Sequence, residues 1–260
     1  MSEADPTSMS DRAPLRMENL PIFTPEAGAL SDHLIIGLDS RDSRSRPFNL
    51  LRTTLAKRVK EKNYRLIGIT SATPSAGKSF LSMNLAASLS RVSDDPVVLV
   101  DLDLRRASLA EALGLDVDCG VSNFLKGEVS DLAATAMRID DTQLMLLPTK
   151  RVSKNTAELV TGPAFDNFIA QLRQRSGQSI VLFDLPPAFA NDDAMLILER
   201  LDAYVMVVDS GKTNRRQVQE VLAMLDPVPC AGTILNRYSG GFADSYGYGY
   251  GASAYAKYYD

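Results

Sequence analysis

The sequence predicts an α/β fold in which a mostly parallel sheet carries helices on both faces. Six short runs rich in Val, Ile and Leu recur along the 260 residues, each about four to six residues long. Strands that are buried on both faces of a parallel sheet have continuous apolar runs of this kind. Segments with helical spacing separate the runs. Alternation of strand and helix is typical of a parallel sheet that is covered on both sides.

The first element of the domain is expected to be a helix that begins near Pro47. Leu51, Leu55 and Val59 follow at helical spacing, and proline fits a first helical turn because no N–H bond is needed there. Two later helices are expected from apolar residues at positions i, i+3, i+4 and i+7. These are Phe165, Phe168, Ile169 and Leu172 in one helix and Val218, Val221, Leu222 and Leu225 in the other.

The apolar runs themselves are expected to form the strands of the sheet. In chain order they read RLIGIT, VVLVDLD, QLMLLP, SIVLFD, AYVMVV and AGTIL. Ligands of open parallel sheets bind at the carboxyl ends of the strands. The polar residues that follow these runs are therefore the candidates for a functional site.

Composition divides the chain into three parts. Residues 1–44 mix Pro, Ser, Asp and Arg without a helical or strand period, which predicts a flexible, disordered segment with one short ordered stretch near HLIIGL. Residues 45–237 carry the strands and helices and are expected to form one domain. Residues 238–260 hold seven of the nine tyrosines, interleaved with glycine, and are expected to be a disordered tail.

The composition argues against several classes of function. The net charge of −4 argues against a nucleic-acid partner. The only histidine, His33, nearly excludes a histidine triad or a zinc site, and Cys119 and Cys230 lack metal-ligand spacing. The acidic start has no signal-peptide pattern, and no stretch approaches the roughly 20 apolar residues that span a bilayer. A cytoplasmic protein is expected.

The first apolar run is followed by a phosphate-binding motif. The stretch ATPSAGKSF fits A-x-x-x-x-G-K-S, a Walker A motif whose first glycine is replaced by Ala72, between a predicted strand and a predicted helix. Main-chain N–H groups of such a loop bind phosphates, Lys78 neutralises their charge and the Ser79 hydroxyl can bind Mg²⁺. The predicted nucleotide-binding residues are Thr73, Pro74, Ser75, Ala76, Gly77, Lys78, Ser79 and Phe80.

Carboxylates end two further strands of the predicted sheet. Asp101 and Asp103 follow one apolar run, and Asp184 follows another, ahead of two prolines. Mg²⁺ takes one or two carboxylates together with oxygens of the nucleotide. Ser79, Asp103 and Asp184 are the candidate metal ligands, and Lys78, Asp101, Asp103 and Asp184 are the candidate catalytic residues.

These motifs resemble those of the bacterial tyrosine kinases of capsule and exopolysaccharide biosynthesis. The family pattern D-x-D-x-R matches Asp101, Asp103 and Arg105, the pattern D-x-x-P matches Asp184 and Pro187, and NTAELV is similar to a further family segment. Members are P-loop NTPases of the SIMIBI type. The resemblance implies ATP and Mg²⁺ as cofactors, and TILNR implies that Asn236 helps to hold the base.

The resemblance also implies the phosphate acceptor and the partners. Family members phosphorylate tyrosines of their own C-terminal tail, here Tyr246, Tyr248, Tyr250, Tyr255, Tyr258 and Tyr259. Asp101 is the candidate for accepting the phenol proton, and Asp103 could exchange roles with it. A membrane polysaccharide co-polymerase is implied as activator, holding the protein at the inner face of the membrane, and a cognate tyrosine phosphatase is expected.

One family motif is incomplete in this sequence. Members carry E-x-x-R-x-x-R in the helix before the first strand and use it to join subunits into a ring. The matching positions here are Arg46, Asn49 and Arg52, and only Arg52 agrees. Self-association, the number of subunits and the choice between phosphorylation within one chain or between chains therefore stay open.

Two other functions are compatible with a P-loop domain. The first is an ATPase like those that position septa or partition plasmids, but these carry a second lysine where this chain has Thr73. The second is a nucleotide-binding regulatory subunit without kinase activity, whose tail docks on a membrane co-polymerase. A test for phosphotyrosine after incubation with ATP separates this subunit from a kinase.

Overall fold

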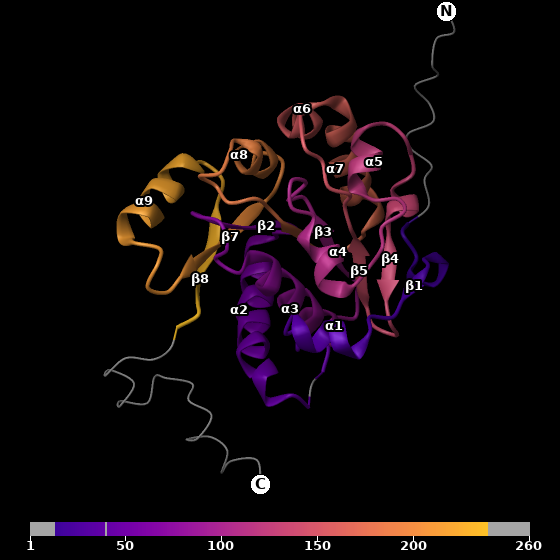
Figure 1. Ribbon diagram of the computed structural model, residues 1–260, viewed down its shortest axis with the longest axis horizontal. Coiled ribbons are helices and arrows are strands. Elements are labelled where there is room, and N and C mark those ends of the chain that lie inside the picture. The colour runs from indigo at the N-terminus through magenta and orange to yellow at the C-terminus, as the bar shows by residue number, and fades with distance from the viewer. Residues whose placement is uncertain (1–13, 40, 239–260) are drawn as a thin grey trace, which may run out of the picture.

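One sheet runs through the protein and sets the positions of the remaining elements (Figure 1). The structure, a computed structural model, describes residues 14–39 and 41–238. Within these residues eight strands pair in the order β1-β4-β5-β3-β6-β2-β7-β8, and the pairs are parallel except for β4 with β5. The strands are β1 (Ile22–Phe23), β2 (Leu66–Ser71), β3 (Val97–Asp101), β4 (Met137–Ile139), β5 (Leu144–Leu147), β6 (Ile180–Asp184), β7 (Ala203–Asp209) and β8 (Cys230–Asn236).

Helices cover both faces of this sheet (Figure 1). One face carries α1 (Ala27–Asp32), α2 (Arg46–Lys62), α3 (Lys78–Ser90) and α4 (Ser108–Leu113). The other carries α5 (Val121–Leu125), α6 (Thr156–Thr161), α7 (Pro163–Arg175), α8 (Asp193–Leu198) and α9 (Arg215–Met224). Short 3₁₀ turns are η2 (Met17–Asn19), η3 (Ser43–Ser45) and η4 (Leu132–Thr135). No helix in this described part has the length and apolar character to cross a bilayer.

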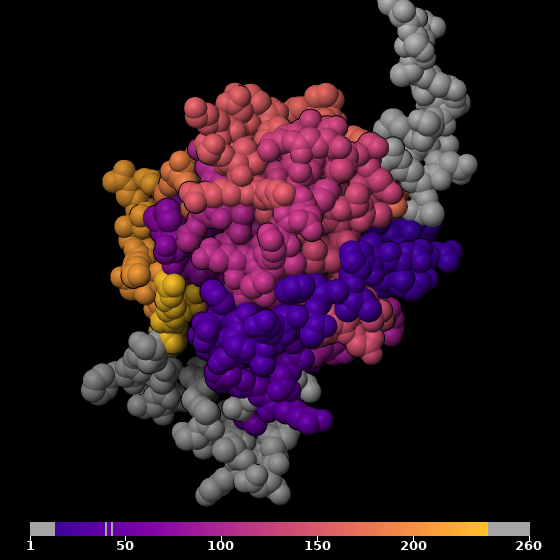
Figure 2. Space-filling model, turned by 45° about the vertical axis from the view of Figure 1, so that its right-hand side comes forward, coloured from indigo at the N-terminus to yellow at the C-terminus, as the bar shows by residue number. Residues whose placement is uncertain are grey.

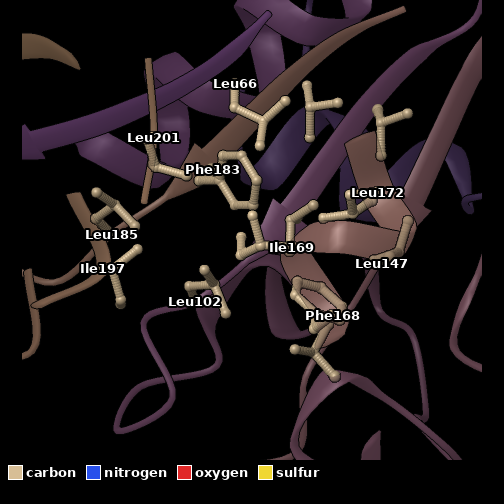
Figure 3. Close-up of a cluster of buried hydrophobic side chains, with 14 of the residues drawn as sticks. Leu66, Leu102, Leu147, Phe168, Ile169, Leu172, Phe183, Leu185, Ile197 and Leu201 are labelled. Carbon is tan, nitrogen blue, oxygen red and sulfur yellow. The ribbon is translucent and has the colours of Figure 1, made fainter. Parts of the chain in front are cut away.

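Alternate residues of each central strand belong to two separate apolar clusters, one on each face of the sheet. In β3, Val97 and Leu99 pack toward α2 and α3, while Val98 and Val100 pack toward α5 and α7. This division follows from the pleat, which points successive side chains to opposite faces. Figure 3 shows the second cluster, in which Phe183 of β6 lies among leucines and isoleucines from the sheet and the covering helices. All four β3 residues are fully buried, so both faces need apolar side chains.

Gly68 lies at the centre of the sheet, where β2 is covered closely by α8. A Cβ at this position would lie 2.6 Å from Leu185 Cδ1 and 2.6 Å from Leu198 Cδ2. Such contacts are far below van der Waals distance, so a larger residue would have to displace these leucines. The glycine therefore sets the spacing between the central strand and α8.

The six strands expected from the apolar runs are present, and so are the helices expected around residues 51, 85, 169 and 221. Two strands were missed. The strands β1 and β4 are two and three residues long, too short for a periodic pattern, and they pair with each other at the edge of the sheet. Neither cysteine forms a disulfide, and Cys230 is exposed on β8.

The segment before α2 contributes to the fold. The sequence predicted a flexible segment over residues 1–44, and the structure corrects this for the residues that it describes. Met17 and Leu20 are buried and β1 joins the sheet, whereas the ordered stretch expected near HLIIGL is present and buries Ile35 and Ile36. Figure 2 shows this segment in indigo against the magenta surface that includes α4. The prediction failed because the apolar residues of this segment contact distant parts of the chain, so their spacing follows neither a helical nor a strand period.

Candidate nucleotide site

The loop between β2 and α3 has the conformation that a phosphate-binding loop needs. Ser75 and Gly77 have left-handed backbones, with φ of 62° and 91°. A Cβ on Gly77 would lie 2.2 Å from the side-chain amide of Asn236, so glycine is required for space as well as for φ. Gly77 also precedes the first residue of α3, a 13-residue helix, whose free N–H groups and dipole favour an anion.

The last residue of β8 and the residue after it bind two consecutive carbonyls of this loop. Asn236 Nδ2 donates to the Ala76 carbonyl at 2.8 Å, and Arg237 Nη1 donates to the Ser75 carbonyl at 2.8 Å. In a trans peptide the N–H points opposite to the carbonyl. The N–H groups of Ala76 and Gly77 are therefore directed away from β8 and are available to a bound anion.

Arg237 is itself held by a buried carboxylate. Its Nη1 lies 2.7 Å from Oδ2 of Asp209, the last residue of β7, whose side chain is 3% exposed. Lys212 lies farther from the same oxygen, at 3.8 Å, and its side chain is 71% exposed. Asp209 therefore fixes the guanidinium that contacts the loop.

Lys78 is buried at the start of α3, close to two acidic strand ends. Burial lowers the pKa of Lys78, and the carboxylates of Asp184 and Asp103 oppose that change. Burial thus disfavours the charged form of the lysine, and the two carboxylates favour it. A phosphate group would supply the additional negative charge that a buried ammonium favours.

Asp184 has an unused oxygen inside the protein. Its Oδ1 accepts from Ser82 Oγ at 3.0 Å, whereas Oδ2 is buried and has no hydrogen-bond partner among the residues that the structure describes. Burial raises the pKa of Asp184 to about 6, and the neighbouring Lys78 and Ser79 oppose the rise. The Ser79 hydroxyl shares a hydrogen bond with Ser108 Oγ at 2.7 Å. An unpaired buried carboxylate oxygen beside a hydroxyl fits a magnesium site that is completed by phosphates and water.

Asp101 and Asp103 occupy different environments although they are two residues apart. Asp101 is fully buried and accepts main-chain N–H groups from Asp103 at 3.1 Å and Leu109 at 3.2 Å. Burial, reinforced by Asp184, raises the pKa of Asp101 well above its usual value. Asp103 lies at the wall of the cavity, where burial raises its pKa and Lys78 opposes the rise. Only Asp103 therefore faces the space where a ligand would bind.

The loop, Lys78 and Asp103 open on one cavity of about 450 Å³. Polar residues of the loop and of the chain after β3 form part of its wall, together with Arg237. Residues from α3, α4 and the segment after α1 form the rest. The complete lining is His33, Ile35, Ser75, Gly77, Lys78, Ser79, Phe80, Met83, Asp103, Arg106, Ser108, Glu111, Ala112 and Arg237.

The chain is similar to bacterial proteins that are named tyrosine-protein kinases. It is 30% identical over 203 residues to the tyrosine-protein kinase wzc of Salmonella typhimurium. The matched region covers 76% of this chain and 28% of that protein. It is 27% identical over 221 residues to the tyrosine-protein kinase YwqD of Bacillus subtilis. Here the matched region covers 83% of this chain and 90% of that protein. No protein-family model matches the chain.

A solved structure supports the same relationship. The kinase domain of the Escherichia coli tyrosine kinase ETK superimposes with a TM-score of 0.71 at 26% identity, over 80% of this chain and 83% of that domain. Over 76–83% of its length the chain is therefore similar to bacterial tyrosine kinases. It spans about a quarter of the length of the first curated relatives, because the matched regions make up 28% and 25% of those proteins. The resemblance to this family expected from the GKS, D-x-D-x-R and D-x-x-P motifs is thereby confirmed.

Most of the site residues expected from the family motifs lie together in the structure. Lys78, Ser79, Asp103 and the loop meet at the cavity, and Asp184 lies beneath them. Asn236 contacts the loop main chain but does not line the cavity. The tyrosines expected as acceptors, Tyr246, Tyr248, Tyr250, Tyr255, Tyr258 and Tyr259, lie outside the described residues.

The positions of the family's ring motif are used inside the chain. Arg52 of α2 donates to the Ser88 carbonyl of α3 at 3.1 Å. Asn49 Oδ1 accepts from Ser88 Oγ at 3.1 Å and from Arg91 Nη2 at 2.6 Å. These two positions therefore connect α2 with α3.

Sequence reasoning missed several residues of the site. Arg237 could have been found, because it directly follows the expected Asn236 at the end of a predicted strand. Arg106 and Ser108 follow the D-x-D motif and could also have been considered. His33 and Ile35 carried no local signal, since only the folded chain brings them to the cavity.

Proposed function

We propose that this protein is a protein-tyrosine kinase that uses ATP and Mg²⁺ to phosphorylate tyrosines of its own C-terminal tail. The observation that carries the proposal is the position of Lys78, buried beside an unpaired oxygen of Asp184 under a loop whose main chain is fixed for anion binding. The kinase names of the relatives support the reaction, and seven tyrosines in the last 23 residues supply acceptors.

The residues of the site divide the work of phosphoryl transfer. The N–H groups of the loop and of the first turn of α3 would bind the phosphate oxygens, and Lys78 would offset their charge. Ser79 and Asp184 would hold Mg²⁺, with Asp103 close to them. A bound magnesium ion would neutralise charge on the terminal phosphates. The phosphates would thus be positioned mainly by groups that are already in place.

Asp103 is the better placed of the two aspartates for the acceptor proton. Its carboxylate faces the cavity, while both oxygens of Asp101 accept main-chain N–H groups. A raised pKa makes Asp103 a stronger base than an exposed aspartate. Asp101 would instead hold the turn that places Asp103 and the start of α4.

The cellular setting also belongs to the proposal. A membrane polysaccharide co-polymerase would act as activator and would hold the protein at the inner face of the membrane. A cognate tyrosine phosphatase would reverse the modification. These partners follow from the polysaccharide systems of the family.

Mass spectrometry of the full-length protein after incubation with Mg·ATP tests the proposal. Each modified tyrosine is expected to add about 80 Da, the mass of a phosphoryl group. Lys78→Met should abolish the signal, and Lys212→Met, which removes an exposed lysine outside the cavity, should keep it. Absence of phosphotyrosine in the wild type, with and without the co-polymerase, would favour a regulatory nucleotide-binding subunit.

A further inference from the structure

We propose that the segment after α1 forms one wall of the subsite that receives the acceptor tyrosine. This inference rests on the proposed kinase function and adds to it the location of the phenol. Ile35, Phe80, Met83 and Ala112 form an apolar part of the cavity wall, and His33 lies at the same cavity. Ile35 and Met83 belong to one hydrophobic cluster, and Phe80 and Ala112 pack against it.

Asn84 attaches this segment firmly to the helix that follows the phosphate loop. Its Oδ1 accepts from the main-chain N–H groups of Ile36 at 2.8 Å and Gly37 at 2.7 Å. Its Nδ2 donates to the carbonyls of Leu34 at 3.1 Å and Phe80 at 2.9 Å. Three of the four hydrogen bonds of this buried amide thus hold residues 34–37 against α3, and the fourth, to Phe80, lies within α3.

The strand order shows on which side of the phosphates this apolar wall lies. The phosphate loop follows β2, and β8 with Asn236 and Arg237 lies on one side of β2. The carboxylates of β6 and β3 lie on the other side. A nucleotide whose terminal phosphate lies near Asp103 and Asp184 therefore has its nucleoside on the β8 side.

The α4 end of the apolar wall lies beyond the carboxylates, on the side away from β8. The helix α4, which carries Ala112, follows β3, and it contacts both α1 and α3. In phosphoryl transfer the attacking and leaving oxygens are roughly in line on opposite sides of phosphorus. The acceptor must approach from the side opposite the nucleoside, and this side carries Ala112 of α4 and, through the contact of α1 with α4, the segment that contains Ile35.

The chemistry of this wall suits a tyrosine ring. A phenol presents an apolar ring and one polar oxygen, and the apolar residues would cover the ring while its oxygen points to Asp103. In the transfer step the phenol oxygen forms a bond to the terminal phosphorus and the bond from phosphorus to the bridging oxygen breaks. ADP leaves with that electron pair, and the phenol proton passes to the carboxylate.

The single histidine makes direct binding measurable without turnover. The NMR signals of the His33 imidazole are free of overlap from other histidines in the full-length protein. With Mg·ADP bound, N-acetyltyrosinamide is expected to shift them in a saturable way, and N-acetylglycinamide is not. No shift, or a shift that is lost once Mg·ADP is added, would overturn the proposal, because the second result places the nucleoside against this wall.

A matched pair of variants tests the same wall through turnover. Ala112→Leu fills the apolar space with a residue that favours helices, and Ala223→Leu makes the same change at an exposed position of α9. Ala112→Leu is expected to slow tail phosphorylation at least tenfold and to change the Kd for a fluorescent ADP analogue less than twofold. Ala223→Leu should change neither. A parallel loss of nucleotide affinity, or no effect on phosphorylation, would contradict the assignment.

The two experiments separate failure of this inference from failure of the proposed function. A wild-type protein that forms no phosphotyrosine while His33 still responds to the phenol would refute kinase activity alone. An active wild type whose His33 does not respond would refute the subsite alone.

Discussion

The guanidinium of Arg237 donates to the carbonyl of Ser75 at 2.8 Å, joining the end of the last strand to the phosphate loop. The residue before it makes an equivalent contact with the next carbonyl of the loop. These contacts fix the orientation of two peptide groups before any ligand binds. Preorganised N–H groups bind an anion without the cost of ordering the loop.

Arg237→Gln is expected to weaken nucleotide binding about tenfold. A hydrogen bond from a charged donor contributes about 1.5–3 kcal/mol, and its loss frees the Ser75 carbonyl. Titration with a fluorescent ADP analogue measures the change. Lys212→Gln is the matched control, because it removes a positive charge near the same Asp209 oxygen and has no contact with the loop. Equal effects of the two variants would attribute the loss to net charge instead of to the loop contact.

Asp101→Asn and Asp103→Asn are expected to have different effects. An asparagine at 101 cannot accept both N–H groups with its carboxamide, so the free energy of unfolding should fall by about 1–3 kcal/mol. Asp103→Asn should keep the stability and lower the rate of tyrosine phosphorylation at least 100-fold, the size expected for loss of a general base. Urea unfolding and phosphotyrosine formation measure the two effects. A stable but inactive Asp101→Asn protein would assign the proton to Asp101.

Arg52→Ala is expected to lower stability by about 1–2 kcal/mol without changing the oligomeric state. The guanidinium connects α2 with α3 through the carbonyl of the buried Ser88, so its loss removes a hydrogen bond from a buried acceptor. Lys57→Ala on the same helix is the control, since its side chain is exposed and its ion pair with Glu61, at 3.8 Å, lies within α2. Thermal unfolding and light scattering report the two properties. A change in mass with unchanged stability would instead support a subunit contact.

Asp202→Asn is expected to remove part of the dependence of stability on pH. Burial alone would raise the pKa of Asp202, but hydrogen bonds from Arg173 and the N–H groups of Leu66 and Arg65 outweigh it and lower the pKa. Because the folded pKa lies below the unfolded value of about 3.9, the ionised carboxylate stabilises the fold above that pH. This contribution is lost as pH falls through the folded pKa.

The measurement is the difference in unfolding free energy between wild type and Asp202→Asn across the acid range. The difference should be constant above about pH 5, a unit above the unfolded pKa, and should shrink as the pH falls below 4. Asp166→Asn, which removes an exposed carboxylate of α7, should show no such trend. A constant difference for Asp202→Asn down to pH 2 would show that its charge does not matter.

Local pattern was sufficient to predict the central sheet and much of the site. The runs around Val98, Leu146 and Leu182 are apolar because both faces are buried, so their sequence alone indicates strands. The GKS motif and the aspartates at strand ends could be placed at one edge because parallel strands share that edge. The family relationship followed from the same motifs.

The parts that escaped prediction depend on contacts between distant residues. Ile35 reaches the cavity because Asn84, 48 residues after Ile36, holds its segment against α3. The distinction between Asp101 and Asp103 arises from which carboxylate meets the N–H of Leu109. Arg52 matched a motif for contacts between subunits, yet its partner Ser88 is in the same chain. No window of neighbouring residues contains this information.

The missing side chain of Gly68 has a consequence at the rim of the site. Even one methyl group at position 68 would clash with Leu185 and Leu198 and would force β2 and α8 apart. The helix α8 begins with Asp193, whose Oδ2 is shared by Thr156, Asn191 and Arg105. A displacement of α8 by a larger residue at position 68 would thus also move Asp193 and its contact with Arg105, the arginine of the D-x-D-x-R motif.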